Sequence, residues 1–391
     1  MNKDRRITII SIMIWAICVI ALIGYYKVIK PNGEKNDTKQ QVEVATTDDS
    51  NNQASDNQYE EKAKSMLSQM NLSEKVGQMF FVRCPEKNAA QVVADYHIGA
   101  YILFARDFEE KTKEQVKDNI KSYQDKAKIP LLIGVDEEGG TVTRISRFTA
   151  FRSSRFKSPQ ELYKEGGLDA ISQDTTEKCQ LLTSLGINVN FAPVCDIATD
   201  TSAFIYDRTL GEDVNETSEY VKQMVYQMKS SNVGSVLKHF PGYGDNKDTH
   251  VGTSSDNRSM DDFRKKDFLP FKAGIEAGTQ CILVSHNVVN AMDSSNPASL
   301  SSKVHEILRD ELGYNGVIIT DDLVMDAITG VENDSEAAVK AVLAGNDMLI
   351  SSNYDKQITA VINAVNDGRI SEDIINKAVT RILCWKLSLG L

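Results

Sequence analysis

The sequence predicts an α/β fold, a single (β/α)8 barrel of the TIM type, preceded by an N-terminal transmembrane helix and a disordered linker. From about Glu60 onward, eight short apolar runs alternate with amphipathic stretches. Strands that alternate with helices indicate a parallel sheet, and eight such units are typical of a closed barrel. A doubly wound open sheet is the alternative, because it also gathers polar strand ends at one edge. The number of units favours the barrel.

The predicted strands are the eight apolar runs, at residues 79–83, 100–104, 131–136, 188–194, 233–239, 281–286, 317–321 and 348–351. Helical patterns lie between most of them, at residues 111–128, 218–230, 261–277 and 303–312. Glycine commonly follows the last turn of a helix. It stands at the expected helix ends as Gly186, Gly278, Gly313 and Gly345.

The composition of the 391 residues is that of an ordinary globular protein, with 41% hydrophobic and 25% charged residues. Acidic residues outnumber basic ones by 55 to 44, which argues against the basic surface of a nucleic-acid-binding protein. The six cysteines have no Cys-x-x-Cys spacing, so we expect buried free thiols outside the predicted anchor. The sequence therefore predicts neither a metal site nor a cofactor.

Residues 1–29 are predicted to form a membrane anchor. Residues 7–26 carry no charge, follow a short basic start, and can span the roughly 30 Å hydrocarbon core of a bilayer. A cleaved signal peptide is the alternative, but the run ends without a good small-residue cleavage site. Residues 30–58 are polar and are expected to be a disordered linker, followed by the barrel domain at residues 59–391. We expect a single-pass protein of the cell membrane with its barrel outside the cytoplasm.

The stretch from Lys238 to His250 is the strongest candidate for a functional loop. It reads Lys-His-Phe-Pro-Gly-Tyr-Gly-Asp-Asn-Lys-Asp-Thr-His and holds two of the five histidines of the chain. A buried strand that ends in a polar, glycine-rich loop is a common way for a scaffold to present reactive groups to a ligand. Two structural alternatives stay open. Lys238 could form a buried ion pair, and His239 could be a hydrogen-bonded core histidine.

Two further apolar runs end in acidic residues. Asp321 and Asp322 follow residues 317–320, and Asp136 begins the sequence Asp-Glu-Glu-Gly-Gly. An acidic residue after a strand can simply cap the next helix, but caps do not explain the histidine, lysine and glycine residues around these strand ends. A long connection without periodicity, residues 196–215, contains Arg208. This arginine belongs either to a functional loop or to a surface salt bridge.

The sequence Lys238-His239-Phe240-Pro241-Gly242-x-Gly244, followed by Asp248-x-His250, resembles the signature of glycoside hydrolase family 3. More narrowly, it resembles the bacterial β-N-acetylglucosaminidases of that family. Further matches are Leu72-Ser73-Glu74-Lys75-Val76-Gly77-Gln78-Met79, Asn190-Phe191-Ala192-Pro193-Val194-x-Asp196, Pro297-Ala298-Ser299-Leu300-Ser301 and Gly316-Val317-Ile318-Ile319-Thr320-Asp321-Asp322. The predicted anchor and linker lie outside the resemblance.

The resemblance implies a role for each candidate residue. Asp321 matches the catalytic nucleophile, and His250 matches the general acid/base of this subgroup, with Asp248 as its partner. Further positions match residues that hold the sugar: Asp136, Arg144, Arg208, Lys238 and His239. His286 lies at a strand end near the site and is carried over with them. Tyr243 departs from the family pattern, in which histidine is common at this position.

The implied activity is that of a retaining, exo-acting β-N-acetylglucosaminidase with a covalent glycosyl–Asp321 intermediate, acting on muropeptides in peptidoglycan turnover. This reaction needs a carboxylate nucleophile and a proton donor for the leaving oxygen. Histidine can be the donor when a neighbouring carboxylate favours its protonated form. A β-glucosidase or xylosidase of the same family is an alternative, but such relatives usually carry a second domain, whereas this sequence ends at Leu391. A second alternative is an inactive module that binds cell-wall glycan without cleaving it.

Overall fold

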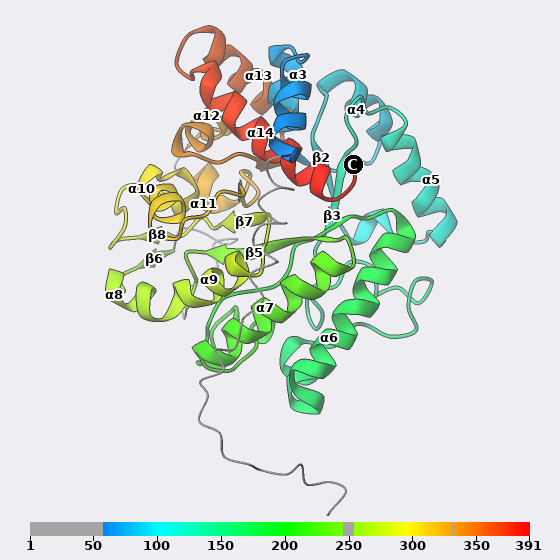
Figure 1. The fold of residues 1–391 in the computed structure, drawn as a ribbon, viewed down its shortest axis with the longest axis vertical. Helices are drawn as coiled ribbons and strands as arrows, with labels where there is room; N and C mark the ends of the chain where they lie inside the picture. Colours follow the sequence, from blue (N-terminus) through cyan, green and yellow to red (C-terminus); the bar gives the residue numbers. More distant parts are fainter. Residues whose placement is uncertain (1–57, 245–253, 331) are drawn as a thin grey trace, which may run out of the picture. The chain divides into compact units, whose positions relative to one another are not determined.

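The computed structural model describes residues 58–244, 254–330 and 332–391 (Figure 1). The predicted transmembrane run, residues 7–26, and the positions of Asp248 and His250 lie outside these residues. Within the described part of the chain, no helix is both long enough and apolar enough to cross a bilayer. Residues 58–67 are helical and lead into the barrel.

The barrel is a parallel sheet of eight strands in the order β10-β1-β2-β3-β4-β5-β7-β9. The strands are β1 Phe80–Arg83, β2 Ala100–Leu103, β3 Leu132–Val135, β4 Val189–Asn190, β5 Gly234–Phe240, β7 Cys281–Val284, β9 Val317–Thr320 and β10 Leu349–Ser351. A parallel bridge between Ile319 and Met348 joins β9 to β10. The sheet is thereby closed, so the barrel prediction is confirmed and the open sheet is excluded.

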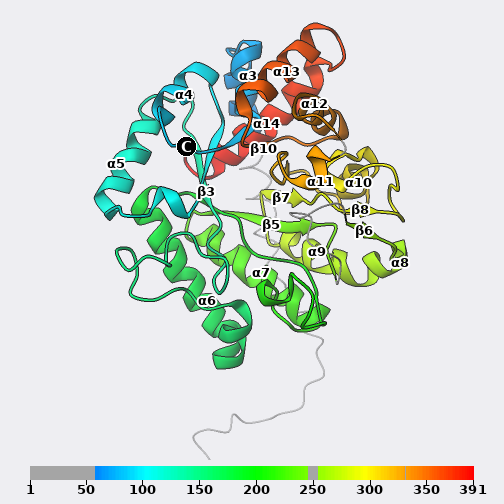
Figure 2. The ribbon, with the colours of Figure 1, turned by 180° about the vertical axis from the view of Figure 1, so that it is seen from behind.

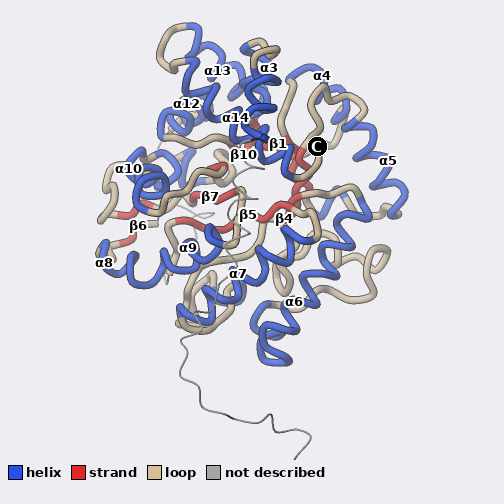
Figure 3. The backbone as a smooth tube through the Cα atoms, in the orientation of Figure 1, coloured by secondary structure: helices blue, strands red, loops and turns tan. Residues whose placement is uncertain are grey.

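The helices lie around these strands (Figure 3). They are α3 Leu72–Gln78, α4 Ala89–Tyr96, α5 Lys113–Gln124, α6 Pro159–Leu185, α7 Val214–Ser230, α8 Met260–Asp262, α9 Phe268–Glu276, α10 Ser302–Glu306, α11 Asp326–Thr329, α12 Asp334–Ala344, α13 Tyr354–Asn366 and α14 Glu372–Ser388. Side-chain caps define where several begin, as at Thr112 and Ser158. Gly186 and Gly345 end α6 and α12 with a positive φ, as predicted. Helix α3 packs against α13 and α14, so the first part of the barrel domain in the sequence lies beside its last helices (Figure 2).

The predicted helix at residues 261–277 is divided into α8, a π-helical turn η4 (Phe263–Asp267) and α9. The predicted helix at residues 303–312 likewise contains a π turn, η6 (Ile307–Glu311), after α10. A π turn brings residues five positions apart onto nearly the same face, which a regular α-helix does not do. Phe263 and Phe268 are five apart and are both fully buried. Burial of both rings therefore accounts for the wider turn.

A separate pair of two-residue parallel strands was not predicted: β6 Ser255–Asp256 pairs with β8 Val288–Val289. These strands lie beside the barrel, in the segments that follow β5 and β7 (Figure 1). Two residues are too few to show an alternating pattern in the sequence.

The barrel interior is filled with apolar side chains beneath the polar strand ends. The rings of Phe81 and Phe191 meet edge to face, with centroids 5.1 Å apart. A Cβ atom at Gly134 would lie 2.7 Å from both rings, so this strand position has to be glycine. As predicted, Cys84, Cys179, Cys195 and Cys281 are buried and free, whereas Cys384 is only partly buried, contrary to the prediction. Burial raises the pKa of the Cys84 thiol to about 12, so it is unreactive at neutral pH.

Candidate active site

The carboxyl ends of the strands surround a cavity of about 590 Å³. Most of the residues predicted to act on or hold the sugar line it together: Asp136, Arg144, Arg208, Lys238, His239 and Asp321. Another cavity, of about 600 Å³, lies before the amino ends of β7 and β9, next to Gln280 and Gly316. It contains none of the predicted site residues, so we place the candidate site in the first cavity.

Lys238 lies at the end of β5 and joins two carboxylates. Its Nζ atom is 2.6 Å from Oδ1 of Asp136 and 2.5 Å from Oε1 of Glu138. The side chains of Lys238 and Glu138 are each only 3% exposed. The buried ion pair considered as an alternative for Lys238 is therefore real, and it lies in the wall of the cavity.

Arg208 reaches the same carboxylate from the connection between β4 and α7. Its Nε and Nη2 atoms donate to the two oxygens of Glu138 at 3.0 and 2.8 Å. Burial opposes the ionisation of Glu138, but the charges of Arg208 and Lys238 outweigh it and hold the pKa of this carboxyl below its usual value. Glu138 is thus a permanent anion that fixes both cations.

His239 links Arg208 to a second buried carboxylate. Nη2 of Arg208 lies 3.1 Å from Nε2 of His239, and Nδ1 of His239 lies 2.8 Å from Oδ2 of Asp196. A guanidinium group can only donate, so Nε2 must accept and the proton must be on Nδ1. Burial, together with Arg208 and Lys238, lowers the pKa of His239 although Asp196 opposes the shift. The imidazole is therefore neutral, and its tautomer is fixed.

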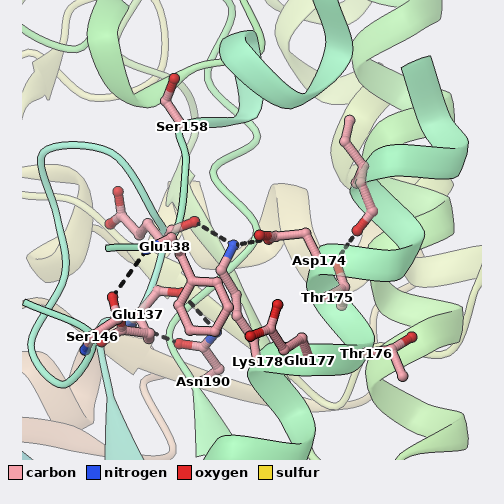
Figure 4. Close-up of polar contacts among 12 residues, drawn as sticks. Glu137, Glu138, Ser146, Ser158, Asp174, Thr175, Thr176, Glu177, Lys178 and Asn190 are labelled. Carbon is pink, nitrogen blue, oxygen red and sulfur yellow. Dashed lines mark hydrogen bonds and ion pairs between the residues drawn. The ribbon is translucent and has the colours of Figure 1, made fainter. Parts of the chain in front are cut away.

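Glu137 shapes the loop that carries Arg144. Its carboxylate accepts the backbone N–H groups of Arg144 and Ile145, both at 2.8 Å, and it also contacts the hydroxyl of Ser146. The main chain of Glu137 is held in turn by the side-chain amide of Asn190, on β4 (Figure 4). The loop brings Nη2 of Arg144 to 3.6 Å from Oδ2 of Asp136.

Lys178, on helix α6, holds the same loop through its backbone. It is 97% buried, and its Nζ atom donates to the carbonyl oxygen of Glu138 at 2.9 Å. It also pairs with Asp174, one turn earlier on α6 (Figure 4). A buried ammonium group bonded to the backbone of Glu138 fixes the direction in which that carboxylate enters the cavity.

Asp321 and Asp322 follow β9, and the structure gives them different surroundings. The backbone N–H of Asp321 donates to the carbonyl oxygen of Val284, on β7, at 3.2 Å. This hydrogen bond holds Asp321 against the barrel sheet. The carboxylate of Asp322 accepts from the Val324 N–H and the Ser352 hydroxyl, at 3.2 and 2.6 Å. Burial raises the pKa of Asp322. Asp322 therefore holds its own loop together.

His286 lies behind the cavity wall, and the described residues that line the cavity do not include it. It is 1% exposed, its Nδ1 atom is 2.7 Å from the Ser299 hydroxyl, and its Nε2 atom is 3.1 Å from the carbonyl oxygen of Asp322. A carbonyl oxygen only accepts, so Nε2 donates. His286 thus supports the backbone beside Asp321, and its role in holding the sugar stays a prediction.

Glu138 and Asp196 are part of the cluster but were not among the predicted site residues. Both stand in motifs that the sequence displays, Asp-Glu-Glu-Gly-Gly and Asn-Phe-Ala-Pro-Val-x-Asp. Both are almost completely buried, and a buried carboxylate needs a partner. Their acidic character next to apolar strands was the available signal. Asp248 and His250 lie outside the described residues, so the structure does not place them relative to the cavity.

A closed parallel barrel with a carboxylate and a polar, charge-paired cluster at its strand ends is compatible with a glycoside hydrolase. Residues 71–384 match the model of the glycosyl hydrolase family 3 N terminal domain, and the chain belongs to this family. The chain is therefore a glycoside hydrolase.

Its relatives include β-hexosaminidases and β-N-acetylglucosaminidases. A beta-hexosaminidase of Nitrosomonas eutropha is 35% identical over 260 residues, which cover 66% of this chain and 74% of the relative. A beta-N-acetylglucosaminidase/beta-glucosidase of Cellulomonas fimi is 27% identical over 346 residues, 84% of this chain and 59% of the relative. The structure of a family 3 beta-N-acetylglucosaminidase from Paenibacillus sp. FPU-7 superposes with a TM-score of 0.76 at 30% identity, covering 82% of this chain and 63% of that one.

Proposed function

We propose that the chain is a retaining, exo-acting β-N-acetylglucosaminidase that removes terminal β-linked N-acetylglucosamine from peptidoglycan fragments. One observation carries the proposal. Asp321 lines the same cavity as the charge-paired cluster of Asp136, Lys238 and Arg208. A nucleophile and a set of oriented sugar-binding groups that line one cavity are part of what glycoside hydrolysis requires. The names of the relatives support the choice of sugar.

The proposed reaction has two steps. The Asp321 carboxylate forms a bond to the anomeric carbon while the bond to the leaving oxygen breaks, and His250 gives its proton to that oxygen. A water molecule then attacks the anomeric carbon, passes its proton to His250, and releases Asp321. Asp248 would favour the protonated form of His250 by its negative charge. Two inversions at the same carbon give net retention.

The cluster opposite Asp321 would hold the sugar. The guanidinium of Arg208 and the ammonium of Lys238 are donors for hydroxyl oxygens, and Asp136 is an acceptor for hydroxyl protons. Their mutual ion pairs keep them in place before the substrate arrives, with Nζ of Lys238 fixed between two carboxylates. Preorganised groups stabilise a transition state because they do not have to reorient during the reaction.

Labelling of the nucleophile tests this proposal. A fluorinated N-acetylglucosaminyl or glucosyl substrate with a good leaving group should trap a covalent adduct on the peptide that contains Asp321. Mass spectrometry then identifies the modified residue, and Asp321→Asn should nearly abolish turnover while keeping the fold. Continued turnover without any adduct would indicate instead that the acetamido group of the substrate is the nucleophile. An adduct on Asp322 would move the role to its neighbour.

A β-glucosidase activity is the second candidate, because the Cellulomonas fimi relative is named for both activities. Product analysis with N-acetylglucosaminyl and glucosyl substrates, in water and in phosphate buffer, separates hydrolysis of either sugar from transfer to phosphate. No turnover of any of these substrates would favour an inactive glycan-binding module.

We also propose that residues 7–26 anchor the enzyme in the cell membrane with the catalytic domain on the outer side. The basis is the uncharged run, the basic start and the polar linker in the sequence. Such a tether would keep the enzyme within reach of cell-wall fragments.

A further inference from the structure

The peptide group between Gly242 and Tyr243 is held at both ends by charged side chains. Its N–H donates to Oδ1 of Asp196 at 2.7 Å, and its carbonyl oxygen accepts from Nη2 of Arg258 at 2.9 Å. One hydrogen bond would leave the peptide plane free to tilt, whereas a charge-assisted bond at each end fixes it. Asp196 is also the partner of His239, so the start of this loop is tied to the candidate sugar-binding cluster.

Arg258 is held rigidly by two buried carboxylates. Its Nε and Nη2 atoms pair with Asp256 at 2.9 and 2.6 Å, and Nη1 pairs with both oxygens of Asp267 at 2.8 and 2.9 Å. Asp256 and Asp267 are 1% and 2% exposed. The guanidinium also lies over the ring of Phe263, 4.3 Å from its centroid. With the bond to Gly242, all five N–H groups of Arg258 have acceptors, a pattern that lysine cannot reproduce.

The loop backbone lies directly against this arginine. A Cβ atom at Gly244 would be 2.8 Å from Cζ of Arg258, and a Cβ atom at Gly242 would be 2.5 Å from Oδ1 of Asp267. Both glycines have a positive φ, of 118° at Gly242 and 55° at Gly244. The two glycines therefore serve two purposes: they allow the turn, and they let the backbone rest on the Arg258–Asp267 pair.

Arg258 joins the two sides of residues 245–253. Gly242 and Gly244 come before that segment, and Asp256 on β6, anchored by its pairing with β8, comes after it. Arg258 is not among the described residues that line the active-site cavity. We propose that Arg258 is a positioning residue: it fixes the backbone at Gly242 and Tyr243, and the proton transfer proposed for His250 depends on this fixed backbone. This inference rests on the acid/base role proposed for His250.

The test compares two leaving groups on the full-length enzyme. N,N′-diacetylchitobiose has a poor leaving group that needs a proton, and a dinitrophenyl N-acetylglucosaminide does not. Arg258→Ala should lower kcat/KM on the disaccharide on the order of 100-fold, the cost of a misplaced catalytic group. On the dinitrophenyl substrate it should lower kcat/KM by less than about threefold, because kcat/KM reports the first step and departure there needs no acid. The comparison uses kcat/KM because His250 is also the proposed base of the second step, which limits kcat on an activated substrate.

Arg264→Ala is the matched control. Arg264 lies in the adjacent turn and pairs with Glu311 at 2.8 Å, but its side chain is 50% exposed. It should leave both rates unchanged. A purely structural defect reduces the fraction of active enzyme and lowers both rates by the same factor, so equal losses in Arg258→Ala would overturn the proposal, as would no loss.

His250→Ala separates this inference from the proposed function. If it loses both rates equally, the acid/base assignment itself fails. If His250→Ala loses much more rate on the disaccharide than on the dinitrophenyl substrate, and Arg258→Ala does not, the acid/base assignment stands. Only the positioning role of Arg258 is then refuted. Arg258→Lys takes the place of Arg258→Ala if the latter does not fold, because it keeps a charged donor but cannot reach all three acceptors. Failure of both variants to fold would assign Arg258 a structural role and contradict the proposal.

Discussion

Lys238 and Glu138 form an ion pair in which both side chains are 97% buried, with Nζ and Oε1 2.5 Å apart. Lys238 comes from the end of β5 and Glu138 from the loop after β3. Removing one partner of a buried pair leaves a charge without compensation and is strongly destabilising. This pair therefore links the stability of the barrel directly to the geometry of the candidate active site.

Glu138→Gln should lower the free energy of unfolding by about 3–5 kcal/mol, because Arg208 and Lys238 lose the carboxylate that they share. It should also lower kcat/KM, since both cations are then less firmly placed. Urea unfolding and steady-state kinetics measure the two effects. Glu177→Gln is the control, because Glu177 pairs with Arg152 at 2.8 Å while 53% exposed, and such pairs contribute less than about 1 kcal/mol. Similar losses in the two variants would contradict the importance of burial.

Asp248→Asn should move the alkaline limb of the pH–rate profile toward acid. The negative charge of Asp248 would raise the pKa of His250, so its removal should lower that pKa, and the proton donor should be lost at a lower pH. The measurement is kcat/KM for the disaccharide as a function of pH. An alkaline limb that stays in place would assign the general acid to another residue.

Lys386→Met should change the pH dependence of stability. Burial lowers the pKa of Lys386 to about 7, against 10.5 as its ordinary value. Between these values the unfolded chain binds more protons than the folded chain, so wild-type stability should rise with pH, by up to about 1.4 kcal/mol per pH unit from this group. Below pH 7 both states are protonated and this contribution is flat.

The readout for Lys386→Met is the slope of its stability difference from wild type between pH 7 and 10. The variant also deprives Gln78 of its donor, 2.6 Å away in the native protein, but this loss is a constant offset. Lys377→Met, on the same helix and 68% exposed, should have no such slope. A difference for Lys386→Met that does not change with pH would refute the neutral, buried lysine.

Protease treatment of intact cells, stripped of their cell wall, should cleave the linker at residues 30–58. This outcome follows if residues 7–26 span the membrane with the barrel domain outside. Immunodetection of the released domain provides the measurement. Cleavage that occurs only after lysis would place the domain in the cytoplasm.

All eight strands could be predicted, because a strand buried on both faces leaves a continuous apolar run in the sequence. The division of residues 261–277 by η4 could not be predicted, because the packing of Phe263 and Phe268 is decided by partners elsewhere in the chain. The pairing of β6 with β8 could not be predicted either, since each strand has only two residues.

The candidate site was predictable to the extent that its residues stand at strand ends in recognisable motifs. Asp136, Lys238 and Asp321 are far apart in sequence, and parallel strands bring them to one cavity. The partners of these residues were not predictable. Glu138 pairs with Lys238 only because β3 and β5 lie on either side of β4. The ring of His286 faces the carbonyl oxygen of Asp322 because the Ser299 hydroxyl holds its other nitrogen.

The pairing of β1 with β10 has a consequence for synthesis of the enzyme. Phe80 pairs with Leu349, so the first strand of the barrel lacks one neighbour until residues 349–351 have left the ribosome. Until then, β1 exposes an unpaired edge that can associate with other chains. A nascent chain that has already exposed Asp321 is therefore still an open sheet, and translation must pass Ser351 before a closed, catalytically organised barrel can exist.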